Sequence, residues 1–146
     1  MLTTPPEKTD TKPTSEFPRI YGILMDWPID DDLIATVFST STGAASLYTT
    51  STFGVIGGEA HENVRKAAIS FVRATDSFYD DSTPTNNYPY PAADRVHFYF
   101  LTFGGVRVID TDLSSLTDRT NKYSGLFDLG QRVVTELRLI TEKDAR

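Results

Sequence analysis

The 146-residue chain contains no cysteine and only two histidines. The absence of cysteine excludes disulfides, thiol nucleophiles and cysteine-bound zinc, and two histidines leave little room for a catalytic triad. The chain also lacks a G-x-S-x-G motif, which would mark the nucleophile of a serine hydrolase. We therefore expect no catalytic site, no cofactor and no bound metal.

Long apolar runs and runs of basic residues are missing too. No apolar run approaches the roughly 18 residues of a membrane span. The first residues, MLTTPPEKTDTKPTSEFP, lack the apolar centre of a signal peptide. The 14 lysines and arginines are dispersed, and the net charge is −6, which opposes binding to nucleic acid or to anionic membranes. We expect a cytoplasmic protein that binds neither.

The overall composition is that of a globular protein, while the first 18 residues have a different composition. Hydrophobic residues make up 39% of the chain and aromatic residues 12%, as in folded domains. Residues 1–18 are rich in threonine, proline and charge, and such a segment cannot offset the entropy cost of ordering by burial. The composition predicts a flexible tail over 1–18 and a single globular domain over 19–146.

The hydrophobic pattern predicts an α+β domain. Alternation with a period of two predicts five strands, at 20–27, 33–40, 45–50, 95–103 and 106–111. A helical period predicts two amphipathic helices, over 61–79 and from 124 to about 140. The order β-β-β-α-β-β-α with short loops predicts a five-stranded, mainly antiparallel sheet with two helices packed on it. Domains of the roadblock, longin and profilin type have similar ingredients, which is an analogy of fold alone.

A glycine-containing turn, Gly54 to Gly58, leads into the first predicted helix. Such a turn can cradle a phosphate at the start of a helix. The spacing matches neither the P-loop nor the dinucleotide motif, and Glu59 and Glu62 occupy the positions where an anion would bind. The sequence favours a tight strand-to-helix turn.

His61 lies at the start of this helix between two glutamates. It could serve as a general base or as half of a metal site, with a further ligand from Asp26 or from Asp30-Asp31-Asp32. Nothing in the spacing brings these groups together, and a solvated, paired histidine is the more common case.

Aromatic residues next to prolines are the best candidates for binding a partner. Tyr88 and Tyr90 alternate with prolines in a loop between the first helix and the fourth predicted strand, and Trp27 precedes Pro28 at the end of a hairpin. Exposed aromatic side chains are typical of protein interfaces. We expect Trp27, Tyr88 and Tyr90 to contact a partner. A weaker second patch comprises Gly57, Gly58 and His61.

Four segments together resemble a small family of bacterial proteins that has no assigned activity. They are YGILMDWP from 21, SLYTTSTFGVIGGEAHENVR from 46, RVHFYFLTFGGV from 95 and YSGLFDLGQRVVTELR from 123. The resemblance covers residues 20–140 and leaves out the N-terminal segment. It implies a bacterial origin and one coherent domain, and it implies no activity, substrate or cofactor.

These observations favour a non-enzymatic protein–protein interaction or scaffold domain, whose partner is another protein or a second copy in a homodimer. One alternative is an acidic inhibitor or immunity-type protein that neutralises a basic toxin, whose affinity would fall with added salt. The other alternative is a small ligand-binding domain or enzyme that uses the turn from Gly57 to His61.

Overall fold

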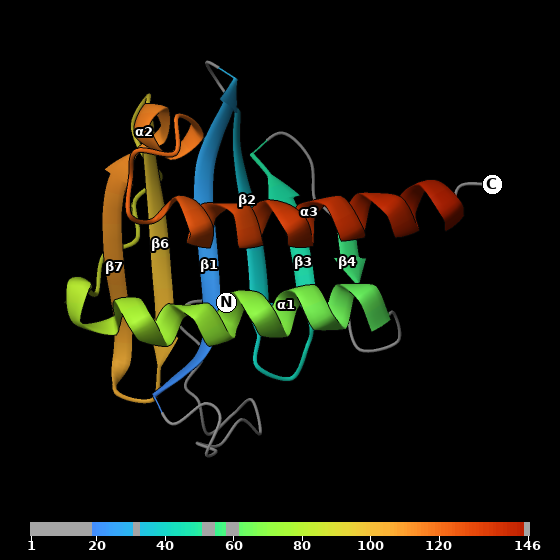
Figure 1. Cartoon of the computed structure of the whole chain (residues 1–146), viewed down its shortest axis with the longest axis horizontal. Helices are drawn as coiled ribbons and strands as arrows, with labels where there is room; N and C mark the ends of the chain where they lie inside the picture. The colour runs from blue at the N-terminus through green and yellow to red at the C-terminus, as the bar shows by residue number, and fades with distance from the viewer. Residues whose placement is uncertain (1–18, 31–32, 51–54, 58–61, 145–146) are drawn as a thin grey trace.

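The computed structural model describes residues 19–30, 33–50, 55–57 and 62–144, and Figure 1 shows their arrangement. The strands are β1 (Ile20–Asp30), β2 (Leu33–Thr40), β3 (Ala45–Thr49), β4 (Val55–Gly57), β5 (Thr83–Pro84), β6 (Arg95–Thr102) and β7 (Gly105–Asp112). The helices are α1 (Glu62–Thr75), the 3-10 helix η2 (Asp76–Asp81), α2 (Leu113–Thr117) and α3 (Ser124–Asp144). The strands form one antiparallel sheet in the order β4-β3-β2-β1-β6-β7-β5.

The predicted class is confirmed: the domain is α+β with an antiparallel sheet. The predicted number of five strands was wrong, because two short strands, β4 and β5, extend the sheet at its two edges. The number of helices was also too low, since the short α2 follows β7. The turn between β6 and β7 is made by Phe103 and Gly104, one residue earlier than the expected Gly104-Gly105 turn.

Both long helices cover the same face of the sheet. In Figure 1, α1 and α3 run side by side across the strands and in opposite directions. Every second residue of the central strands points toward these helices, so that Ile23, Met25, Val37 and Phe98 are fully buried beneath them. Within the described part of the chain, no helix covers the opposite face of the sheet, which we call the helix-free face.

The helices pack on the sheet through apolar stripes and one close approach. In α1 the buried side chains recur at helical spacing and include Val64, Ala68 and Phe71. In α3, Gly130 is buried against the sheet, and a methyl group there would lie only 2.7 Å from the terminal carbon of Met25 and 2.9 Å from the ring of Phe71. Glycine at this position therefore lets α3 approach both β1 and α1.

Strand β1 organises the sheet because it pairs with β2 on one side and with β6 on the other. Its register places Asp26 opposite Thr36 of β2 and opposite His97 of β6. These three residues come from sequence positions up to 71 apart, yet the sheet makes them neighbours on one face.

None of the helices in the described ranges is both long and apolar enough to cross a membrane.

Candidate functional site: a polar cluster and a loop on the helix-free face

The centre of the helix-free face is a cluster of polar side chains around Asp26. Met25 and Trp27, on either side of it in β1, belong to the core under the helices. Since side chains alternate along a strand, Asp26 must point to the helix-free face. Its neighbours across the sheet, Thr36 and His97, point the same way. The strand pairing thus brings a carboxyl, a hydroxyl and an imidazole group together.

Asp26 is buried, with only 4% of its surface exposed. Its carboxylate accepts a hydrogen bond from the Thr36 hydroxyl, with an Oγ1–Oδ1 distance of 2.5 Å. Burial disfavours the charged form and raises the pKa of Asp26 to about 6, against the smaller opposing effects of the Thr36 hydrogen bond and of His97. With its pKa at about 6, the Asp26 carboxyl group gains or loses its proton near that pH, well above the range of an ordinary aspartate.

His97 lies between carboxylates and the backbone of the 85–94 loop. Its Nδ1 atom is 3.1 Å from the carbonyl oxygen of Pro89 and 3.2 Å from the Tyr99 hydroxyl. Its Nε2 atom is 3.5 Å from Asp110, which also pairs with Arg95. A proton on Nε2 would thus face the carboxylate of Asp110, while Nδ1 faces the Pro89 carbonyl oxygen and the Tyr99 hydroxyl oxygen.

The loop is held over the cluster by two tyrosines. The buried Tyr99 donates a hydrogen bond from its hydroxyl to the Pro89 carbonyl at 2.7 Å. The ring of Tyr88 meets the ring of Tyr99 edge-on, with 5.9 Å between their centroids. Burial, with the charges of Asp26 and Asp110, raises the pKa of Tyr99 to about 12, so the hydroxyl keeps its proton and remains a donor.

Apolar side chains surround this polar centre on the same face. The strand register places on it half-buried side chains from three strands, β2, β3 and β7: Ile34, Phe38, Tyr48, Val106 and Val108. Leu24 and Leu101 lie between them and are buried. The face therefore combines an aliphatic and aromatic surface with a titratable centre.

This cluster is not arranged as a metal centre. No group of three or more histidine, aspartate or glutamate side chains among the residues that the structure describes could hold a metal ion. Asp26 is buried, and both ring nitrogens of His97 face partners within the chain, so these groups hold the sheet and the loop together.

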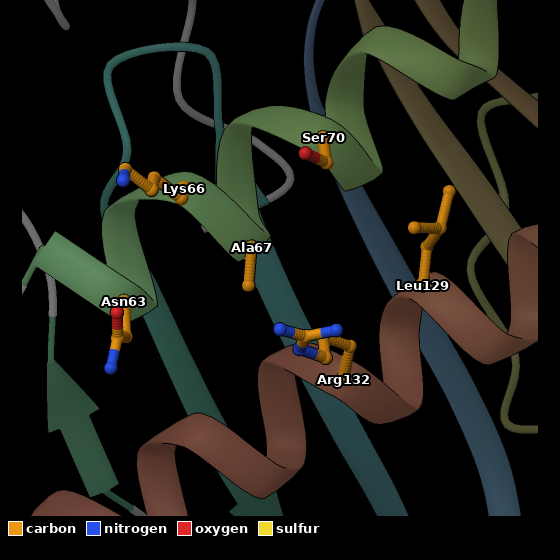
Figure 2. Close-up of a pocket in the computed structure, with 6 residues that line it drawn as sticks. All are labelled: Asn63, Lys66, Ala67, Ser70, Leu129 and Arg132. Atoms are coloured by element: carbon orange, nitrogen blue, oxygen red, sulfur yellow. The ribbon is translucent and has the colours of Figure 1, made fainter.

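A second surface feature lies on the opposite side of the molecule, between α1 and α3. It is a groove of about 180 Å³ lined by six side chains (Figure 2): Asn63, Lys66, Ala67, Ser70, Leu129 and Arg132. The guanidinium group of Arg132 lies in the gap between the helices, below Ala67 in this view. None of the six lining residues is acidic.

The structure separates the aromatic residues that the sequence grouped together. Trp27 is 7% exposed and belongs to the core beneath the helices, which corrects the expectation of a surface tryptophan at the hairpin end. The alternation of β1 forces this orientation, because Asp26 takes the other face. Tyr88 is half-buried against Tyr99, and Tyr90 is 62% exposed. Of these three residues, only the two loop tyrosines expose much of their surface.

The glycine patch is described only in part. Gly57 lies in β4, where it pairs with Ala45, and so belongs to a strand and not to the predicted turn. Gly58 and His61 lie outside the described residues. The proximity of Asp26 to His97 has no signal in the sequence, because it depends on the pairing of β1 with β6.

No protein-family model, no curated protein and no solved structure matches this chain.

Proposed function

We propose that this chain is a non-enzymatic protein-binding domain and that its helix-free face is the binding surface. The observation that carries the proposal is the set of half-buried aromatic and branched side chains on that face, with Phe38 and Tyr48 on one side of Asp26 and Val108 on the other. An extended apolar surface with a polar centre is typical of sites where another protein docks.

The loop adds exposed aromatic surface at the edge of this face. Tyr90 is exposed, and Tyr88 is anchored to the sheet through Tyr99. Tyrosine buries a large area on binding at a low entropy cost, because it has few rotatable bonds. Tyr88 and Tyr90 would thus extend the apolar contact beyond the strands.

The partner in this proposal is another protein, and a second copy of the chain is the simplest case. A symmetric dimer would pair the same face of two subunits, so each Phe38 and Tyr48 would meet apolar residues of the other subunit. The bacterial cytoplasm is the proposed setting.

Charge substitutions on the two sides of the face test the proposal. Tyr48→Lys and Val108→Lys each place a charge on the helix-free face, and both should abolish self-association in light scattering or retention of the partner in affinity capture. Leu139→Lys is the matched control, since Leu139 is 52% exposed on α3. If all three variants bind like the unmodified chain while melting normally, the helix-free face is not the binding surface.

A further inference from the structure

We propose that the groove between α1 and α3 binds an acidic side chain of a partner protein. This inference adds a second binding surface to the proposed function and specifies the chemistry of what it binds. The two surfaces lie on opposite sides of the sheet, so each can be altered without the other.

The six side chains that line the groove offer hydrogen-bond donors and include no acidic group, while Glu62 and Glu136 contact its two cations from outside the lining. Arg132 contributes a guanidinium group from α3, while Asn63 and Ser70 contribute an amide and a hydroxyl from α1. Lys66 lies at the rim, with its ammonium group 3.5 Å from Glu62. In a chain with a net charge of −6, a donor-rich groove whose lining contains no carboxylate is complementary to a carboxylate from another molecule.

The Arg132 guanidinium has N–H donors that make no hydrogen bond within the described part of the chain. Its ion pair with Glu136 spans 3.8 Å, and within the described part of the chain it makes no hydrogen bond. An arginine presents five N–H donors in a planar fork that matches both oxygens of a carboxylate. Because the side chain is 71% exposed, it can reorient toward an incoming carboxylate at little cost.

The size of the groove selects a side chain and not a free small molecule. Its volume of about 180 Å³ is below the range of roughly 300–1,000 Å³ that is typical of small-molecule pockets. Ala67 and Leu129 supply an apolar lining against which the methylene groups of a glutamate can pack. A glutamate or aspartate side chain from a docked protein therefore fits both the volume and the lining.

Titration with an acetylated oligoglutamate peptide tests this inference on the full chain, by calorimetry and by amide and arginine side-chain NMR at low and at physiological salt. We expect the NMR chemical shifts of Asn63, Ser70 and Arg132 to change on addition of the peptide. Arg132→Gln should weaken binding about tenfold, since it removes a charge-assisted bidentate contact. Lys66→Gln should weaken it by about two- to threefold, because the rim charge is screened by solvent.

Arg138→Gln is the matched control, because it removes the same charge from an exposed position of α3 outside the groove. Equal losses in Arg132→Gln and Arg138→Gln would overturn the inference, since they would show diffuse attraction. The inference would also be overturned if the chain bound inorganic phosphate but not the peptide, or if the peptide did not bind at low salt. Tyr48→Lys should leave peptide binding unchanged, so this inference and the proposed function can fail independently.

Discussion

Asp26 is a buried carboxyl group whose environment disfavours its charge. The folded chain holds its proton up to a pH of about 6, whereas an unfolded aspartate loses it near 3.8. Between these two values the folded state binds more protons than the unfolded state, so the free energy of unfolding falls as pH rises. The stabilisation is complete below about pH 4 and lost above about pH 6.

Asp26→Asn should remove this dependence. The amide can still accept the Thr36 hydrogen bond but carries no charge, so at pH 7 the variant should be more stable than the unmodified chain, by up to about 3 kcal/mol. Urea unfolding at several pH values between 4 and 7 measures the effect. Asp110→Asn is the control, since Asp110 is 52% exposed and its neutralisation should bring no such gain. If the free energy of unfolding changed with pH in the same way for Asp26→Asn and for the unmodified chain, Asp26 would not be the source of the pH dependence.

Two glycines of α3 provide a matched pair. Gly130→Ala should destabilise the domain by about 1–3 kcal/mol, because the added methyl group would meet Met25 and Phe71 within 3 Å. Gly125→Ala places the same group in open space in the first turn of the helix and should be neutral or stabilising by up to about 1 kcal/mol. Thermal unfolding of both variants measures the difference, and equal melting temperatures would show that α3 does not pack as closely as described.

At the scale of elements, hydrogen bonds at Thr85 and Asp94 fix the two ends of the 85–94 loop, and the Pro89 carbonyl fixes its middle to the sheet. Tyr99→Phe removes the hydroxyl that donates to this carbonyl and keeps the ring that contacts Tyr88. The loss should cost about 1 kcal/mol and should speed amide hydrogen exchange in the loop without affecting the central strands. Tyr90→Phe serves as the comparison, because Tyr90 is exposed. If both variants exchange at the same rate as the unmodified chain, the hydrogen bond does not hold the loop.

The long elements were predictable because their patterns are strong. The alternation of β1 and β6 and the helical stripe of α1 are local signals that tertiary contacts reinforce. β4 and β5 have three and two residues, and they are strands only because β3 and β7 pair with them. The five-residue α2 likewise depends on a specific contact, since Asp112 caps it by accepting a hydrogen bond from the Ser115 amide.

The candidate site was less predictable than the fold. The sequence shows that Asp26 opposes Met25 and Trp27 in a strand, but it does not show which strand lies next to it. The neighbours of Asp26 come from β2, which is adjacent in sequence, and from β6, which is 71 residues away at His97. A pairing over this distance has no local signal, so the cluster appears only once the sheet is assembled.

For the whole molecule, one sheet separates two different surfaces. The helix side carries a small, donor-rich groove, and the helix-free side carries an apolar face around Asp26 and His97. We propose that the domain contacts one protein through its helix-free face and binds acidic side chains in its groove. The helix-free face is the proposed protein-binding surface.

Site-specific photo-crosslinking in living cells tests this claim most directly. Tyr48 on the helix-free face would be replaced by the photoreactive benzoylphenylalanine, which resembles tyrosine in shape, and Leu139 on α3 would be replaced in the control. We predict that position 48 forms a discrete covalent adduct, either with a second copy of the chain or with another protein, and that position 139 does not. No adduct at position 48, or the same adducts at both positions, would contradict the claim that the helix-free face is a protein-binding surface.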